Sequence, residues 1–140
     1  MLYSELTHEI IEACFEVSNE LGVGFLESVY QNALLLVLRQ KGIAAQVQVL
    51  LVVRFRGQIG GQFVADMVVE GKVLLELKAV RALTNEHKAQ TVNYLQATGI
   101  DVGLLINFGT PRVEHHRLYR PDGPGDPKAA TRMRETGYTG

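Results

Sequence analysis

The spacing of apolar residues changes near residue 42, and this change constrains the fold more than any other feature of the sequence. Before it, apolar side chains recur every three or four positions over residues 6–21 and 25–41, which predicts two amphipathic helices. Ser4 or Thr7 suits the start of the first helix as a cap, and Gly22 suits its end. After it, β-branched residues dominate, so the chain passes from helices to a sheet.

Three consecutive strands are predicted after this change. Residues 47–55 form the first strand, closed by Gly57 and by Gly60-Gly61. Residues 63–69 and 73–79 form the next two, joined in a hairpin around a short glycine-containing turn. Short turns between consecutive strands favour antiparallel pairing.

A third helix and two further strands complete the predicted fold. The helix begins near Thr84 or Asn85 and ends at Gly99, because both residues suit a cap and glycine suits a helix end. Residues 102–107 are predicted to form a buried strand, and residues 113–119 an edge strand. A helix between two strands permits one parallel pair. The sequence therefore predicts an α/β fold, a mixed β-sheet flanked by α-helices.

The composition is that of one folded domain. The chain has 140 residues, 46% of them hydrophobic and 21% charged, which is enough to bury one core. Its 14 basic and 15 acidic residues leave a formal net charge of -1, so any nucleic-acid binding needs a local basic patch. We expect a domain over residues 1–120 and a flexible C-terminal tail over residues 121–140, where no apolar period is found.

The single cysteine and the short apolar runs indicate the cellular compartment of the protein. Cys14 cannot form a disulfide within the chain, whereas secreted domains of this size often contain several. No apolar run is long enough to cross a bilayer. We therefore expect a cytoplasmic protein with no membrane partner.

Two acidic residues on neighbouring strands are the strongest chemical signal. Asp66 lies on the first strand of the predicted hairpin, and Glu76 and Lys78 share one face of the second strand. A two-residue loop would pair Asp66 with Leu75 and turn Glu76 away. A three-residue loop with Gly71 in a left-handed conformation would pair Asp66 with Glu76, and we expect this loop.

Paired carboxylates on adjacent strands favour a metal site. Their β-carbons would lie about 5 Å apart, so the two charges repel unless a proton or a cation lies between them. Mg²⁺ or Mn²⁺ accepts oxygen ligands, which Asp66, Glu76 and the backbone carbonyl of Leu77 would supply with water and phosphate. Lys78 would stabilise negative charge at the phosphate. The alternative is a cross-strand salt bridge between Lys78 and either acid on a solvated face.

The same residues resemble a known motif. Asp66 followed by Glu76-Leu77-Lys78 is similar to the core motif of the PD-(D/E)XK nuclease superfamily, and residues 24–30 resemble the signature of its GxxExxY family. The resemblance implies a restriction-endonuclease-like fold in which Asp66 and Glu76 bind the metal and Lys78 is the catalytic lysine. The sequence departs from the pattern at Ala65, where proline is usual, and at Val64, where a basic residue is common.

The resemblance also implies site roles for residues on two helices. These are Glu27, as an extra acid near the metal, and Gln90 and Tyr94 on the helix after the lysine strand. From the residues alone, capping of the second helix also explains Glu27. Tyr30 is a candidate for substrate contact, although packing is the more ordinary role of such a tyrosine. His87 is a candidate general base or substrate contact, although a histidine at a helix start is often solvated.

These residues together predict Mg²⁺-dependent hydrolysis of nucleic-acid phosphodiesters, with DNA as the expected substrate. The alternative is a catalytically silent module that keeps the nuclease-like fold and binds nucleic acid or a protein partner. A small domain that grips duplex can also act as a homo-oligomer, but no residue pattern indicates one.

Overall fold

The computed structural model describes residues 1–129, which form three helices and five strands. The helices and strands are α1 (Ser4–Leu21), α2 (Glu27–Gln40), β1 (Ala45–Phe55), β2 (Gln58–Val69), β3 (Val73–Lys78), α3 (Asn85–Thr98), β4 (Val102–Asn107) and β5 (Glu114–Tyr119). Their order is the one predicted from the change in apolar spacing. One boundary was predicted wrongly, because β2 runs through Gly60 and Gly61, where we expected a break.

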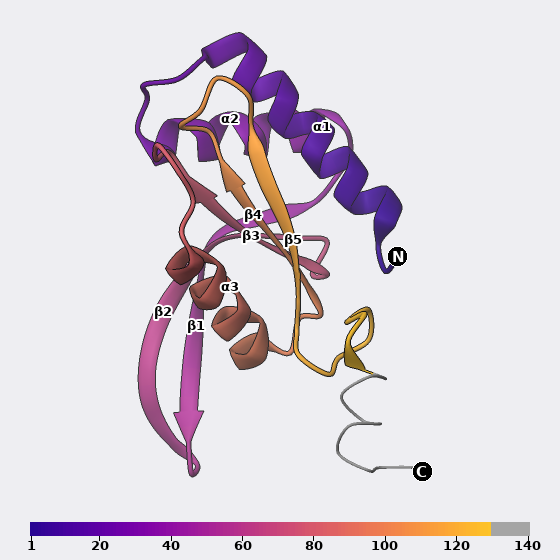
Figure 1. The fold of residues 1–140 in the computed structure, drawn as a ribbon, viewed down its shortest axis with the longest axis vertical. Coiled ribbons are helices and arrows are strands. Elements are labelled where there is room, and N and C mark those ends of the chain that lie inside the picture. The colour runs from indigo at the N-terminus through magenta and orange to yellow at the C-terminus, as the bar shows by residue number, and fades with distance from the viewer. Residues whose placement is uncertain (130–140) are drawn as a thin grey trace.

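The five strands form one sheet in the order β1-β2-β3-β4-β5. Neighbouring strands are antiparallel except β3 and β4, which are parallel and are connected through α3. Figure 1 shows this mixed sheet with α1 and α2 near one end and α3 packed beside the strands. The predicted α/β fold with a mixed sheet flanked by helices is confirmed.

Helices cover both faces of the central strands. The larger core cluster joins residues of α1 and α2 to Leu75 and Leu77 of β3, whereas a smaller cluster joins Leu95 of α3 to Leu74. Side chains alternate between the two faces of a strand, so β3 contributes to both clusters. Burial on both faces explains why β3 and β4 are nearly uninterrupted apolar runs.

The helix ends follow the sequence at three points and depart from it at a fourth. Gly22 and Gly99 end their helices with φ of 72° and 75°, as expected for glycine. Thr84 caps α3 by accepting the backbone N–H of His87. The predicted cap of α1 is wrong, because its capping residue is Tyr3, which makes no side-chain cap.

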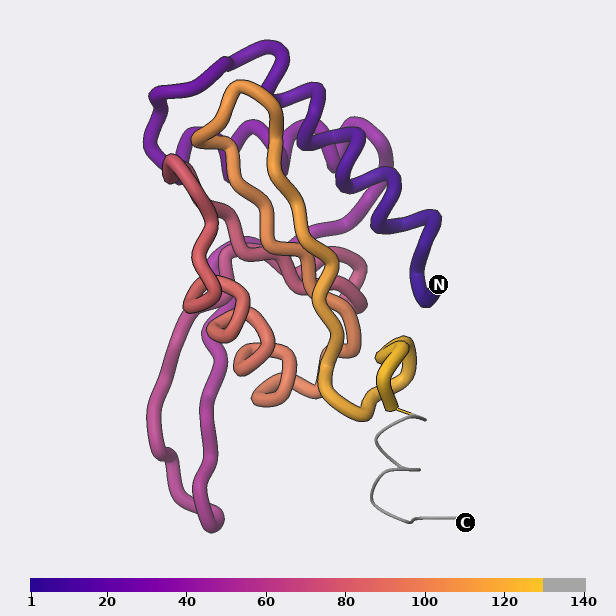
Figure 2. Tube along the Cα trace, viewed as in Figure 1, coloured from indigo at the N-terminus to yellow at the C-terminus, as the bar shows by residue number. Residues whose placement is uncertain are grey.

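The hairpin of β1 and β2 projects from the sheet, and we call its outer part, residues 49–65, the arm. Figure 1 shows the arm extending beyond the other strands, and Figure 2 follows its trace to the tip. Its tip is a two-residue turn of Arg56 and Gly57, with φ of 51° and 77°. Positive φ at both positions is typical of the tight turn that fits strand twist.

The segment after β5 returns to the body of the domain as far as it is described. Arg120 forms an ion pair with Asp101 at 2.7 Å, and Gly123 is buried against Arg120. Residues 130–140, most of the expected flexible tail, lie outside the described residues, so the division at residue 120 stays a prediction. Among residues 1–129, no helix combines the length and apolarity needed to cross a bilayer.

Candidate active site

The loop between β2 and β3 sets the register of the two acidic residues. Val69 pairs with Val73, and Met67 pairs with Leu75. Three residues therefore form the loop, and Gly71 adopts φ of 66°. This is the predicted loop, and its register continues to place Asp66 opposite Glu76.

The regular ladder between β2 and β3 ends just before these acids, and their side chains replace it. The Oδ2 atom of Asp66 accepts the backbone N–H of Leu77 at 2.7 Å. The Oε1 atom of Glu76 accepts the backbone N–H of Asp66 at 3.3 Å. Both carboxylates therefore lie where the two strands part, and each is held by the other strand.

Burial and the charge of Asp66 perturb Glu76. Glu76 is only 4% exposed. Its pKa is raised to about 8, first by burial and then by the charge of Asp66, against smaller opposing effects of the Asp66 backbone N–H and of Lys78. Close carboxylates favour a shared proton or a bound cation. The electrostatics of the pair therefore fit a divalent cation.

Lys78 ends β3 beside this pair. Alternation along β3 gives it the same face as Glu76, and it is half-buried. Its charge acts on Glu76, yet no ion pair within 4.0 Å joins Lys78 to an acid in the described part of the chain. The salt bridge that the sequence left as an alternative is therefore not formed.

Asn107, a residue that the sequence analysis missed, holds the chain just after Lys78. It is fully buried at the end of β4. Its side chain accepts the N–H groups of Val80 and Gly109 and donates to the Val80 carbonyl and to Glu114, at 2.9–3.1 Å. The only sequence signal was a polar residue ending an apolar strand. Asn107 thus fixes the path of the backbone as it leaves the lysine strand.

A cavity of about 410 Å³ opens beside Asp66 and Leu77. Its other walls are Glu27, Ser28 and Gln31 of α2 and Gln48 of β1. Glu27 therefore shares a cavity with Asp66, in agreement with its expected place near the acids.

Gln48 is the second residue that the sequence analysis missed. The β1–β2 register places it opposite Asp66, and its side chain donates to Oε1 of Gln31 at 2.7 Å. Its φ of 50° is in the left-handed region, which is costly for a residue other than glycine and is concentrated at functional sites. A glutamine between Val47 and Val49 was a weak signal because the alternation of a half-exposed strand explains it.

Tyr94 is brought to the acids, as expected. Its pKa is raised by burial and by the negative charges of Glu76 and Asp66, so its hydroxyl lies in their field. Its ring stacks on Phe63 of β2, with ring centroids 3.9 Å apart.

Three other expected site residues are placed differently. The ring of His87 accepts the backbone N–H of Thr84 through Nδ1 and completes the cap of α3, so it is not directed at the acids. Gln90 is exposed on α3 and makes no hydrogen bond to Asp66 or Glu76.

Tyr30 is the third, and it is fully buried. Its hydroxyl donates to the Gly22 carbonyl at 2.6 Å and accepts the Phe25 N–H at 3.3 Å. Its ring stacks on Phe108 with centroids 4.7 Å apart. These contacts give Tyr30 a packing role and leave no surface for the substrate contact that we had expected.

The atoms that could bind a metal ion beside Asp66 and Glu76 are few, and all of them are oxygens. Within residues 1–129, no three side chains of His, Cys, Asp and Glu gather closely enough to hold a metal ion by themselves. Two carboxylates and a backbone carbonyl leave places for water and phosphate, which suits Mg²⁺ or Mn²⁺ better than a transition metal bound by imidazole or thiolate.

Comparison with known proteins bears on the fold and the family of this chain. The crystal structure of SSO0001 is similar to this chain with a TM-score of 0.55 and 21% sequence identity, over 96% of this chain. This chain spans 66% of SSO0001, just under two thirds, and at this identity the likeness shows the fold alone. No curated protein matches the chain. The family profile of the PD-(D/E)XK nuclease superfamily matches residues 4–118, and the chain therefore belongs to this superfamily.

Proposed function

We propose that the protein hydrolyses phosphodiester bonds in nucleic acid at the site formed by Asp66, Glu76 and Lys78. The observation that carries this proposal is the position of two carboxylates where β2 and β3 part, with the pKa of Glu76 raised first by burial and then by the charge of Asp66. Superfamily membership supports nuclease chemistry, and such nucleases generally use divalent metals.

Asp66, Glu76 and the Leu77 carbonyl are the proposed ligands of Mg²⁺ or Mn²⁺. When bound, such an ion neutralises charge on the phosphate and lowers the pKa of water. The hydrogen bond from the Leu77 N–H holds the Asp66 carboxylate in place. Glu27, across the cavity, places a further carboxylate within reach of water in that space.

Lys78 is the proposed catalytic lysine. It follows the proposed metal ligands directly and has no carboxylate partner within ion-pair distance in residues 1–129, so its ammonium group is available to the phosphate. A positive charge there stabilises the negative charge that develops on the phosphate oxygens. Asn107 maintains this position through the backbone of Val80.

The narrower family and the substrate are part of the same proposal. Residues 24–30 support membership of the GxxExxY family, and we take DNA as the substrate. A silent binding module is the second candidate, and the specific observation in its favour is that neither Gln90 nor His87 forms a hydrogen bond with Asp66 or Glu76 in residues 1–129. The two candidates differ in turnover and share the same fold.

A cleavage assay separates the two. Supercoiled plasmid, single-stranded DNA and RNA are incubated with Mg²⁺ or Mn²⁺ and the wild type, Asp66→Ala or Lys78→Ala. The exposed Lys72 lies in the loop of the same hairpin, so Lys72→Ala is the matched control. Cleavage that is kept in the control and lost in both site variants supports the enzyme. Cleavage that survives in Asp66→Ala and Lys78→Ala would exclude this active site, and binding without products would favour the silent module.

A further inference from the structure

A second and larger cavity lies between the arm and α3, and we call it the arm groove. Its volume is about 730 Å³. Its lining comes from both strands of the arm and from the second half of α3: Val52, Val53, Arg54, Phe63, Asn93, Tyr94, Gln96 and Ala97. Neither Asp66, Glu76 nor Lys78 lines it, so it is a separate feature of the surface.

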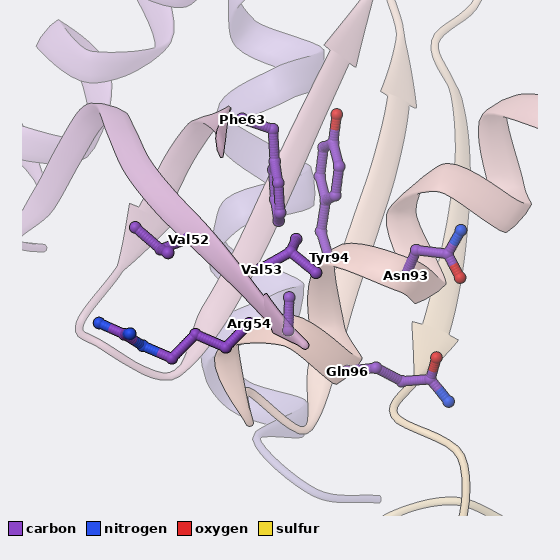
Figure 3. A pocket seen from close by; sticks show the side chains of 8 residues that line it. Val52, Val53, Arg54, Phe63, Asn93, Tyr94 and Gln96 are labelled. Carbon is purple, nitrogen blue, oxygen red and sulfur yellow. The ribbon is translucent and has the colours of Figure 1, made fainter. Parts of the chain in front are cut away.

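Two stacked aromatic rings form one end of the arm groove. The rings of Phe63 and Tyr94 have centroids 3.9 Å apart and planes 15° apart. Figure 3 shows them face to face, with Arg54 and Gln96 toward the other end of the groove. Proteins that hold unpaired bases without reading their sequence stack those bases on aromatic side chains in a positively charged groove. The facing sides of Phe63 and Tyr94 are occupied by each other, so a base would stack on the outside of the pair.

The only charged residue in the lining is Arg54. Within the described chain its guanidinium has no acidic partner, and no acid occurs anywhere in the arm, whose charges are Arg54 and Arg56. Asn93 and Gln96 add exposed amide groups that can donate and accept hydrogen bonds. The groove therefore offers a stacking surface, one cation and neutral polar groups.

Tyr94 connects the arm groove to the acids. It lines the groove, and its hydroxyl lies in the electrostatic field of Glu76 and Asp66. Phe63 precedes Asp66 by three residues on β2, a distance of about 10 Å along a strand. A strand of nucleic acid whose base occupies the groove would therefore bring its backbone toward the acids.

We propose that the arm groove binds an unpaired base of single-stranded nucleic acid, which stacks against the outer side of the Phe63–Tyr94 ring pair while Arg54 contacts the adjacent phosphate. This inference rests on the proposed function, since it names the form of the substrate that reaches the acids. One or two cations bind a duplex backbone weakly, whereas stacking on aromatic rings requires a base that is free of its partner. The formal net charge of -1 also gives the chain little overall attraction for a duplex backbone.

Tryptophan fluorescence tests the stacking directly, because the chain contains no tryptophan. Phe63→Trp keeps an aromatic ring in the groove and adds the only indole. Phe55→Trp is the matched control, on the same arm but outside the groove lining and 67% exposed. The titrations use the full chain in EDTA, so that no hydrolysis occurs. We expect single-stranded DNA to quench Phe63→Trp in a saturable way and to leave Phe55→Trp nearly unchanged.

Affinity measurements with a fluorescent oligonucleotide provide the second readout. Phe63→Ala should weaken single-strand binding about 5- to 100-fold, the range for losing one stacked base. Arg54→Ala should weaken it and reduce the salt slope, which is expected between about -0.7 and -1.4 for one or two phosphate contacts. Arg56→Ala, at the arm tip, should have the smaller effect. A circular dichroism spectrum confirms that each variant is folded.

Several results would overturn the inference. These are equal quenching of both tryptophan variants, equal affinity for single strand and duplex, or equal losses in Arg54→Ala and Arg56→Ala, which would indicate generic attraction to the arm. Failure of the proposed function gives a different pattern. Single-strand binding that depends on Phe63, without cleavage in Mg²⁺, would support base binding in the arm groove and contradict the proposed nuclease activity. Cleavage that depends on Asp66 but not on Phe63 would support the nuclease activity and contradict base binding in the arm groove.

Discussion

The carboxylate of Asp66 accepts the backbone N–H of Leu77 at 2.7 Å, in place of the strand-to-strand hydrogen bond that a regular ladder would form. A backbone N–H that donates to a carboxylate fixes the position of that carboxylate. Leu77 is itself anchored in the core, being 2% exposed. The protein therefore holds Asp66 in place through its own backbone.

The first prediction concerns the charge of this carboxylate. Asp66→Asn keeps an oxygen that can accept the Leu77 N–H, so the fold should persist, but it removes the negative charge next to Glu76. We expect Mg²⁺ affinity to fall by about tenfold or more and cleavage to fall to background. Isothermal titration with Mg²⁺ and Mn²⁺ measures the first effect, and plasmid cleavage the second. Glu20→Gln, an exposed acid on α1, should change neither. Unchanged metal affinity in Asp66→Asn would remove Asp66 from the metal site.

The second prediction concerns the pH dependence of stability in the absence of metal. The pKa of Glu76 is about 8 in the folded protein and 4.5 ordinarily, so the folded state keeps a proton that the unfolded state releases between these values. The free energy of unfolding should therefore decrease as pH rises from about 4.5 to about 8, by up to about 1.4 kcal/mol per pH unit. Below and above that window Glu76 should add no slope.

Glu76→Gln isolates this contribution. Urea denaturation in EDTA between pH 5 and pH 9 should show a flatter profile for Glu76→Gln than for the wild type. Mg²⁺ should restore the stability of the wild type at pH 8, because the ion binds the charged form. Profiles that run parallel in the two proteins would show that Glu76 titrates normally and is not perturbed by Asp66.

The sequence predicted most of the sheet because its signals there were local. Gly71 allowed a left-handed three-residue loop, and that loop alone set Asp66 opposite Glu76. By contrast, Gly60 and Gly61 suggest a turn when considered locally, yet β2 continues through them because β1 pairs on either side of Gly60. Val53 lies opposite Gly61 and Arg54 opposite Ile59, and Gly60 falls at the irregularity between these pairs. Pairing across the hairpin determined that element.

The unpredicted parts of the site depend on contacts between distant residues. Asn107 makes hydrogen bonds to Val80, 27 residues away, which no spacing rule indicates. His87 has the residue type of a catalytic base, but its hydrogen bonds to Thr84 use it as a cap. The residue type of Tyr30 suits substrate contact, but its full burial against Phe108 depends on how α2 meets the end of β4.

The third prediction concerns Asn107. Asn107→Leu has a similar size but leaves the N–H groups of Val80 and Gly109 and the Val80 carbonyl without a partner. Leaving buried polar groups unpaired should lower the free energy of unfolding by at least about 2 kcal/mol. It should also lower the cleavage rate, because the backbone after Lys78 loses its anchor. Urea denaturation and cleavage assays measure both, with the exposed Asn32→Leu as control. Wild-type rates in a destabilised Asn107→Leu would limit Asn107 to a stabilising role.

The fourth prediction compares two glycines of ordinary φ. A β-carbon at Gly109 would lie 2.1 Å from the Val80 carbonyl oxygen, whereas one at Gly61 would meet nothing within 4 Å. Gly109→Ala must therefore displace the segment that follows Lys78, while Gly61→Ala only adds a methyl group to the arm. We expect Gly109→Ala to lower the melting temperature and the cleavage rate, and Gly61→Ala to preserve both. Equal melting temperatures would mean that the contact between Gly109 and Val80 is loose.

The fifth prediction concerns the left-handed conformation of Gln48. Glycine adopts a φ of 50° without the steric cost that glutamine incurs, so Gln48→Gly should raise the free energy of unfolding by several tenths to about 1 kcal/mol. Gln46→Gly is the matched control, on the same strand without positive φ, and should lower it by about 0.5–1 kcal/mol. If the glutamine serves the cavity beside Asp66, the more stable Gln48→Gly should also cleave more slowly, a trade-off typical of strained functional residues. Urea denaturation and cleavage rates on the same preparations test both parts. A variant that is more stable and fully active would show that Gln48 contributes strain and no function.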